Sequence, residues 1–407
     1  MLFESMHLFC GIFFNPYICL HFILIKISVM DSTFRIYPIG IQNFEDLRNN
    51  NNVYVDKTEL IYRLANTNKV YFLSRPRRFG KSLLVSTLDA YFRGKKDLFQ
   101  GLAMERLEKE WNVYPVLHID FSMTKYTALS DLVGQLNLNL YDWEKLYGKE
   151  EVEETPAERF RGVIRRAYEK TGKPVVVLVD EYDAPLLDSN HLPELQNELR
   201  EEMRKFFSPL KAQGEYLRFL FLTGISPFSQ INSIFSGLNN MLNISILGNY
   251  SSICGITERE LRTQLKTDIE MMAQANNETY EEACVHLKQQ YGGYHFSENS
   301  EDTCNPFSLF NAFSQKNYGN FMIVPTFLVD MLQQNKMDIC KLEGTMATVG
   351  QLDTTINPAV DILPVLYQNG YFTINEYDPE FQLYTLACPN KEVREGLTRL
   401  FRTALVV

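Results

Sequence analysis

The chain has 407 residues, of which 45% are hydrophobic and 22% charged, and its formal net charge is −10. This composition is that of an ordinary globular protein with room for two or three domains, and it excludes a disordered or fibrous chain. The acidic balance gives no overall electrostatic attraction for nucleic acid. The seven cysteines form no C-x-x-C pair and are odd in number. They favour reduced thiols in the cytoplasm over a disulfide framework.

Residues 1–30 form an apolar, aromatic extension that lacks the pattern of a targeting signal. No positive segment precedes the apolar run, and no small-residue cleavage site follows it. Asn15, Pro16 and His21 interrupt the run, whereas a membrane-spanning helix needs about 20 apolar residues. We therefore expect this extension to lie outside the fold, with Met30 as the true start. A membrane anchor is the alternative.

The folded region is expected to begin at residue 31 and to include a short helix before the first strand. Asp56 stands three residues before Glu59, which predicts a capping box at the start of that helix. The helix leads into residues 69–92, which read as a strand, a tight loop and a second helix.

The strand-loop-helix segment carries the main functional signal. Residues 70–73 are a run of strand-favouring residues, and apolar residues recur at helical spacing over 83–92. Gly80, Lys81 and Ser82 stand where the helix begins and match the end of the phosphate loop G-x-x-x-x-G-K-[ST]. Backbone N–H groups and the helix dipole bind phosphate at such a place. Lys81 would reach the β- and γ-phosphates, and the Ser82 hydroxyl would coordinate Mg²⁺.

The loop departs from the motif at one position, because Arg75 stands where the first glycine belongs. Taken alone, the G-K-S tripeptide is as consistent with an ordinary strand-to-helix turn as with nucleotide binding. Basic residues cluster here at Arg75, Arg77, Arg78 and Lys81. The cluster is either a solvated basic turn or a phosphate-facing loop.

Further apolar runs predict the rest of the sheet. Residues 113–121 and 217–224 read as buried strands. Five consecutive apolar residues within 174–182 suit a central strand covered on both faces. Residues 251–255 predict a fifth, shorter strand. Strands that alternate with helices indicate a doubly wound α/β architecture.

Polar residues end these predicted strands. Phosphoryl transfer needs a phosphate cradle, a metal ion and a positioned water. Asp180 fits the acid that holds Mg²⁺ alongside Ser82, and Glu181 fits the base that activates the water. A solvated acidic pair is the alternative, and the phosphate loop on an earlier strand favours the functional interpretation. Thr223 is a candidate hydroxyl for sensing the γ-phosphate, whereas Asp120 reads as a loop or capping acid.

Helical patterns dominate from about residue 257, which indicates a smaller helical domain after the sheet. Residues 361–387 then read as a helix and a hairpin. The expected organisation is an extension (1–30), a nucleotide-binding domain (31–256), a helical domain (257–360) and a hairpin with a terminal segment (361–407).

Five segments together resemble the AAA-ATPase-like family of P-loop proteins. They are R-I-Y-P-I-G-I-Q-N-F-E-D-L (35–47), Y-V-D-K-T-E-L-I (54–61), F-L-S-R-P-R-R-F-G-K-S-L-L (72–84), V-D-E-Y-D-A-P-L (179–186) and F-L-T-G-I-S-P-F-S (221–229). Y-G-G-Y-H-F-S (291–297) and N-P-F-S-L-F-N-A-F (305–313) extend the resemblance into the second domain.

The resemblance implies a P-loop NTPase core of the additional-strand type, with a parallel sheet covered by helices on both faces. A smaller helical, winged-helix-like domain would follow. An arginine at position 75 is ordinary for the family, so ATP and Mg²⁺ are the expected cofactors. We expect the nucleotide to contact Arg75, Pro76, Arg77, Arg78, Phe79, Gly80, Lys81, Ser82, Leu83 and Thr223. The expected metal residues are Ser82 and Asp180, and the expected catalytic residues are Lys81 and Glu181.

Family members commonly continue into a PD-(D/E)XK nuclease-like domain, and no such core is visible before Val407. Two departures bear on hydrolysis rather than on binding. Pro227 stands where relatives often carry lysine, and the segment 320–325 is shorter than its counterpart.

The sequence therefore predicts an ATP-binding P-loop protein with slow Mg-dependent ATPase activity. The alternative is a nucleotide-gated interaction module that has negligible turnover and regulates a nuclease or another effector. No arginine finger is assignable, so a protein effector or a second copy of the chain is the expected partner. Nucleic acid would be reached only indirectly, through a separate nuclease-like domain. Membrane attachment is not expected.

Overall fold

The computed structural model describes residues 35–235, 238, 240–298, 300–323, 342–354 and 362–404. Its largest sheet has five strands in the order β2-β3-β4-β1-β5, and neighbouring strands run parallel. The strands are β1 (Val70–Ser74), β2 (Val116–Asp120), β3 (Val175–Asp180), β4 (Leu217–Gly224) and β5 (Leu242–Asn243). The predicted α/β class with a parallel sheet is confirmed.

The register brings the carboxyl ends of the strands to one edge of the sheet. Leu73 of β1 lies beside Thr223 of β4, and Asp120 of β2 lies beside Asp180 of β3. Every residue of β3 is buried, which explains its unbroken apolar run. The residues that end β1, β3 and β4 therefore share the edge at which open α/β sheets bind ligands.

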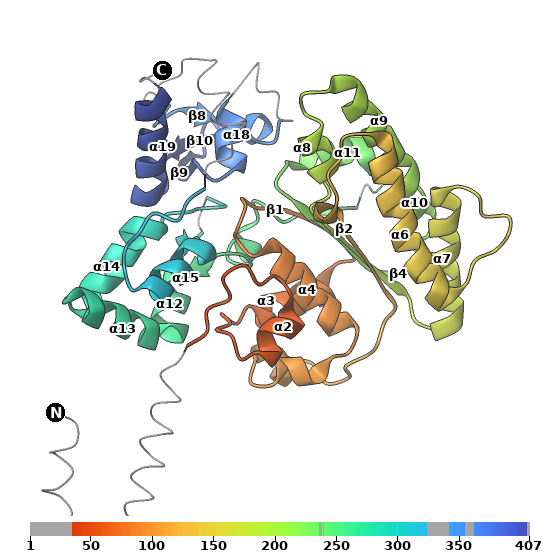
Figure 1. Cartoon of the computed structure of the whole chain (residues 1–407), viewed down its shortest axis with the longest axis horizontal. Coiled ribbons are helices and arrows are strands. Elements are labelled where there is room, and N and C mark those ends of the chain that lie inside the picture. The colour runs from red at the N-terminus through yellow and green to blue at the C-terminus, as the bar shows by residue number, and fades with distance from the viewer. Residues whose placement is uncertain are drawn as a thin grey trace, which may run out of the picture.

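Helices cover both faces of the sheet (Figure 1). Successive residues of a strand point to opposite faces, so the sheet contributes to two separate hydrophobic cores. The first core lies under α2 (Phe44–Asn49), α3 (Thr58–Thr67) and α4 (Lys81–Phe92). The second lies under α6 (Leu129–Tyr147), α7 (Pro156–Thr171) and α9 (Pro193–Phe207). Shorter helices are η1 (Lys96–Phe99), α5 (Ala103–Leu107), η2 (Phe121–Met123), α8 (Ala184–Asp188), α10 (Pro209–Ala212), α11 (Phe228–Ile234) and η3 (Gly248–Tyr250).

The predicted strands are wrong in two details. The second strand begins at Val116 rather than at residue 113, and Val113 is 62% exposed. The fifth strand is Leu242–Asn243, whereas residues 251–255 form no strand. Ile253 and Cys254 lie in a loop and pack into the first core, which accounts for the apolar residues that suggested a strand.

The predicted capping box is also wrong. Lys57 is the N-cap of α3 and makes no side-chain cap bond. Asp56 lies one position earlier, where its carboxylate accepts from the backbone N–H and the hydroxyl of Thr58 and from the N–H of Ala103. Glu59 therefore lies one position too early for the reciprocal bond.

The chain after β5 forms a helical layer with a small sheet. The helices are α12 (Glu258–Gln264), α13 (Lys266–Asn276), α14 (Tyr280–Tyr291) and α15 (Pro306–Gln315), and the strands are β6 (Ile256–Thr257) and β7 (Thr303–Cys304). Tyr37, from the start of the described chain, stacks on Phe310 and Phe313 of α15. The start of the described chain therefore packs against this layer.

A three-stranded antiparallel sheet completes the described chain, in the order β8-β10-β9. Its strands are β8 (Met346–Ala347), β9 (Thr373–Asp378) and β10 (Leu383–Ala387), and its helices are α17 (Val349–Leu352), α18 (Leu363–Gln368) and α19 (Lys391–Ala404). The helix and hairpin predicted over 361–387 are confirmed as α18 and β9-β10. Because β8 pairs with β10, this sheet crosses the predicted boundary at residue 360.

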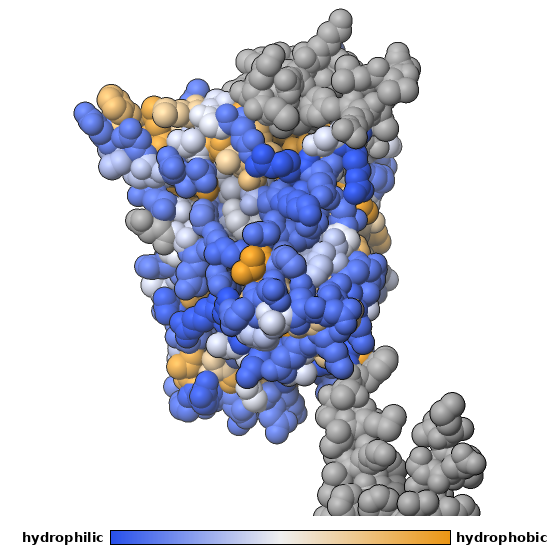
Figure 2. Space-filling model, turned by 90° about the vertical axis from the view of Figure 1, so that its left-hand side faces the viewer, coloured by the Kyte–Doolittle hydropathy of each residue, from blue (hydrophilic) through white to orange (hydrophobic). Residues whose placement is uncertain are grey.

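On the face shown in Figure 2, hydrophilic residues predominate and apolar residues stand in scattered groups. Within the described ranges, no helix combines the length and the apolar character needed to cross a bilayer.

The described residues from β6 to α19 (256–404) are called the C-terminal layer below. This layer packs directly against the loop that follows β1. The Phe79 ring lies edge-on to Tyr294 and Phe296, with centroids 4.8 and 5.3 Å apart. Gly370, at the turn after α18, lies so close to Pro76 that a Cβ atom there would come within 2.8 Å of the proline side chain. This close approach fixes the C-terminal layer against the loop.

We expect Gly370→Ala to destabilise the protein more than Gly344→Ala. Both glycines have positive φ, +78° and +82°, but a Cβ atom at Gly344 would meet nothing within 4 Å. Both variants therefore incur backbone strain of about 1 kcal/mol, and only Gly370→Ala adds a steric clash worth about 1–3 kcal/mol. Urea unfolding measures the difference. Equal losses in the two variants would show that the contact with Pro76 does not matter.

Candidate functional site

The loop between β1 and α4 has the backbone conformation of an anion-binding turn. Gly80 is the N-cap of α4 and has φ +94°, a conformation that favours glycine. Arg78 also has positive φ, +69°. No side chain caps the first turn of α4, and no acidic residue lies in it. Among the described residues, no side chain therefore bonds to the N–H groups at this helix start, which suits them to phosphate.

A cleft of about 540 Å³ opens over this loop. Its size is within the range of small-molecule sites, about 300–1,000 Å³. Of the predicted site residues, those that line it are Arg77, Arg78, Gly80, Lys81, Ser82, Leu83 and Glu181. The cleft therefore gathers the G-K-S tripeptide and the proposed base in one place.

Lys81 and Glu181 form an ion pair inside the cleft. The Lys81 Nζ lies 3.3 Å from the Glu181 Oε1, and the two side chains are 3% and 21% exposed. Lys81 also donates to the carbonyl of Pro76 at 3.4 Å. Glu181 has φ +48°, a conformation uncommon for this residue type. The turn after β3 therefore aims the glutamate back at the phosphate loop.

Asp180 precedes Glu181 at the end of β3 and is 3% exposed. Burial, and secondly the nearby Glu181 charge, raise the pKa of Asp180 to about 6, whereas the Ser82 side chain opposes that rise. A buried carboxylate next to a hydroxyl offers the oxygen ligands that Mg²⁺ prefers.

Thr223 faces the same side of the sheet as Asp180. Thr223 shares the strand face of Phe221, and Asp180 shares that of Leu178, and both apolar residues belong to the core under α4. Thr223 is fully buried, and its hydroxyl has no hydrogen-bond partner within the described residues. An orphaned hydroxyl at this edge leaves one donor free for a phosphate oxygen.

Arg75 does not line the cleft. Its side chain is 2% exposed and donates to the carbonyls of Ser74 and Ser245 at 2.9 and 2.7 Å, and to those of Tyr250 and Ser251 at 3.4 Å. Its guanidinium stacks on Phe296, 4.1 Å from the ring centroid. Burial lowers the pKa of Arg75 to about 10.

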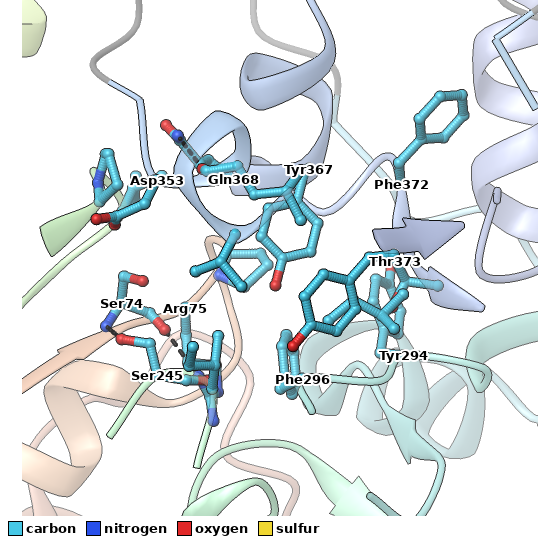
Figure 3. A pocket seen from close by; sticks show the side chains of 18 of the residues that line it. Ser74, Arg75, Ser245, Tyr294, Phe296, Asp353, Tyr367, Gln368, Phe372 and Thr373 are labelled. Atoms are coloured by element: carbon cyan, nitrogen blue, oxygen red, sulfur yellow. Dashed lines mark hydrogen bonds between the residues drawn. The ribbon is translucent and has the colours of Figure 1, made fainter. Parts of the chain in front are cut away.

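Figure 3 shows Arg75 with Ser245 and Phe296 at the wall of a separate cavity of about 80 Å³. Pro76 also lines this cavity, and neither Pro76 nor Phe79 lines the cleft. The side chains of these three loop residues, Arg75, Pro76 and Phe79, therefore lie outside the cleft and contact the C-terminal layer.

Several cleft residues carried no functional signal in the sequence. Phe307 and Phe310 of α15 line it, together with Pro38 and Ile41 from the start of the described chain. These four residues supply an apolar wall. The N-P-F-S-L-F segment contributed to the family resemblance, but only the fold shows that it reaches the cleft.

Asp120 and Lys125 show how the edge beside β3 is organised. Asp120 accepts from the N–H of Ser122 and caps η2, so the prediction of a capping acid is confirmed. Lys125 lines the cleft and pairs with Asp188 at 2.8 Å. Within the described residues, no group of three or more histidine, cysteine or acidic side chains could hold a metal ion.

We expect Arg75→Lys to destabilise the protein by about 2–4 kcal/mol, because lysine cannot reproduce the fork of carbonyl bonds or the stacking on Phe296. Arg77→Lys, at an exposed position of the same loop, should change the free energy of unfolding by less than about 0.5 kcal/mol. Chemical denaturation of both variants measures these effects. If Arg75→Lys leaves the free energy of unfolding unchanged, the guanidinium does not brace the loop.

Comparison with known proteins agrees with this geometry. Residues 38–235 match the family model described as "Predicted AAA-ATPase". A curated relative, "Uncharacterized protein in vnfD 5'region" of Azotobacter chroococcum mcd 1, is 34% identical over 366 residues. The match covers 88% of this chain and 68% of that protein.

Proposed function

Because the chain belongs to the AAA-ATPase-like family, we propose that it binds ATP with Mg²⁺ in the cleft over the phosphate loop and hydrolyses it slowly. The observation that carries this proposal is the convergence of Gly80, Lys81, Ser82 and Glu181 on one cleft, with the buried Asp180 next to Glu181 at the end of β3. Bound Mg²⁺ would be held by Ser82 and Asp180 and would neutralise phosphate charge.

The residues of the cleft suggest how the nucleotide is oriented. Phosphates would lie at Gly80 and Ser82, where the start of α4 is uncapped. The base would lie toward the apolar wall of Pro38, Ile41 and Phe310, since apolar and aromatic side chains suit a planar ring.

The Lys81–Glu181 ion pair links binding to chemistry. A phosphate oxygen would replace Glu181 as the counterion of Lys81, because both compete for the same ammonium group. The released Glu181 carboxylate could then accept a proton from water, as a general base must. Thr223 does not line the cleft in the ligand-free structure, and we propose that its orphaned hydroxyl donates to a phosphate that reaches the end of β4.

The wider setting also stays a proposal. We place the protein in the cytoplasm on the grounds of its cysteine pattern, and we expect a protein effector or a second copy to supply an arginine finger. The division into 31–256, 257–360 and 361–407 is a proposal from the sequence, and the pairing of β8 with β10 joins its last two parts. The winged-helix-like character of the second part is also a proposal.

A nucleotide-gated interaction module is the second candidate, and one observation favours it. The Arg78 guanidinium stacks on Phe307 of α15, 4.1 Å from its ring centroid, and both residues line the cleft. A nucleotide that attracts Arg78 would compete with this stacking and loosen the C-terminal layer. Such a module would need binding but no turnover.

Removal of the phosphate-loop lysine tests nucleotide binding. Lys81→Ala should abolish the thermal stabilisation by Mg-ATP, because the ammonium group is the principal partner of the phosphates. The wild type should gain about 2.7 kcal/mol at a ligand concentration 100 times Kd. Lys145→Ala, on the outer surface of α6, is the control and should respond like the wild type. If Lys81→Ala is stabilised equally, the phosphate-loop assignment is wrong.

Replacement of the proposed base separates the enzyme from the switch. Glu181→Gln should lower phosphate release at least about 100-fold. It should bind Mg-ATP as tightly as the wild type or more tightly, because the ion pair that occupies Lys81 is lost. Steady-state phosphate release and equilibrium binding give the two readouts. Equal background release from both proteins would defeat the ATPase proposal and leave the switch.

A further inference from the structure

We propose that Asp183 is a positioning residue that clamps the turn carrying Glu181 to the end of β4. This inference rests on the proposed ATPase function and adds a residue to its site. Asp183 follows Asp180 and Glu181 in the sequence V-D-E-Y-D, but it lines no part of the cleft and touches no expected ligand position.

The clamp consists of hydrogen bonds between two loops that are distant in the sequence. The Asp183 side chain is fully buried, and its Oδ2 accepts from the N–H groups of Ile225 and Ser226 at 3.1 and 2.6 Å. The neighbouring Tyr182 donates its backbone N–H to the Thr223 carbonyl at 3.1 Å. Its hydroxyl donates to the Pro227 carbonyl at 3.1 Å. The turn after β3 is therefore hydrogen-bonded to Thr223 at the end of β4 and to the three residues that follow Gly224.

The turn itself is short and constrained. Ala184 donates its N–H to the Glu181 carbonyl at 2.9 Å, which closes the turn over Asp183. Glu181 sits in this turn with positive φ, so its direction depends on what holds the turn in place. Such conformations persist only where the surroundings determine them. The Asp183 side chain supplies two of those bonds, and Tyr182 supplies the others.

Gly224 shows how closely the two loops approach. A Cβ atom at Gly224 would lie 2.4 Å from the Asp183 Oδ1 and 2.9 Å from its Cγ. That Oδ1 has no hydrogen-bond partner in the described part of the chain. Burying a carboxylate with an unpaired oxygen costs stability. An apolar side chain would fill this space at a lower cost in stability. The presence of a carboxylate here therefore favours a positioning role for Asp183.

Pro227 also takes part in the contact between the two loops. Its carbonyl accepts the Tyr182 hydroxyl, and it is the N-cap residue of α11. Movement of the β4 end, which carries Thr223, would reach Glu181 through the Tyr182–Thr223 backbone bond and through the bonds from Ile225 and Ser226 to Asp183. The γ-phosphate sensor and the base would respond together.

The test compares Asp183→Ala, Asp183→Asn and Gly224→Ala with the control Asp268→Asn. Asp268 is a buried acid of α13 that bonds to Arg35 and Tyr37 and lines no part of the cleft. Asparagine at position 183 keeps an oxygen that can accept both N–H groups. Gly224→Ala keeps Asp183 but displaces its carboxylate, and it serves if Asp183→Ala fails to fold.

The first readout is amide hydrogen exchange of the ligand-free proteins, which needs no activity. In Asp183→Ala and Gly224→Ala, exchange should accelerate at least about tenfold over both 181–184 and 225–226. Asp183→Asn should restore most of the protection, and Asp268→Asn should leave both segments unchanged. If Asp183→Ala deprotects 225–226 alone, the residue is only a local hydrogen-bond partner and the proposal fails.

The second readout is single-turnover hydrolysis together with Mg-ATP affinity. Asp183→Ala should hydrolyse at least about tenfold more slowly, since small misplacements of a catalytic group are costly, while its Kd stays within about threefold. Wild-type hydrolysis in Asp183→Ala would overturn the proposal. If the wild type itself releases no more phosphate than Glu181→Gln, the ATPase function fails, and the exchange experiment alone decides the role of Asp183.

Discussion

The buried guanidinium of Arg75 is the interaction on which the phosphate loop depends. A loop with free N–H groups and two positive φ residues gains few contacts of its own. Arg75 holds it from behind by donating to four backbone carbonyls of the loop and of the chain after β5. The pKa of Arg75 falls to about 10 because of burial, so the group still carries its charge at neutral pH. The position that usually holds a flexible glycine is thereby used as an anchor.

The Arg75 side chain also joins the phosphate loop to the C-terminal layer. Phe296 stacks on Arg75 and lies edge-on to Phe79, while Phe307 stacks on Arg78 and lines the cleft. The C-terminal layer is therefore part of the site rather than an appended domain. A ligand that changes the loop must act on these aromatic contacts, which is why hydrolysis and switching are both reasonable outcomes of one geometry.

Long, doubly buried strands could be predicted from the sequence, because burial on both faces demands the apolar runs seen in β3 and β4. The two-residue strand β5 could not, since its pairing with β1 depends on tertiary context. The G-K-S tripeptide and Asp180-Glu181 could be singled out from the sequence because their proposed chemistry depends on local spacing, and the structure brings Gly80, Lys81, Ser82 and Glu181 to one cleft. The direction of the Arg75 side chain was not, because a loop sequence does not say which face of the loop a residue takes. Phe307 was missed since its place in the cleft depends on how the C-terminal layer packs.

The most direct test of the account is a structure of the protein with Mg²⁺ and a non-hydrolysable ATP analogue. The account predicts phosphates at Gly80 and Ser82, Mg²⁺ beside Ser82 and Asp180, and Lys81 paired with phosphate instead of Glu181. It also predicts that Arg75 keeps its carbonyl partners. A nucleotide bound elsewhere, with the Lys81–Glu181 ion pair intact, would contradict it.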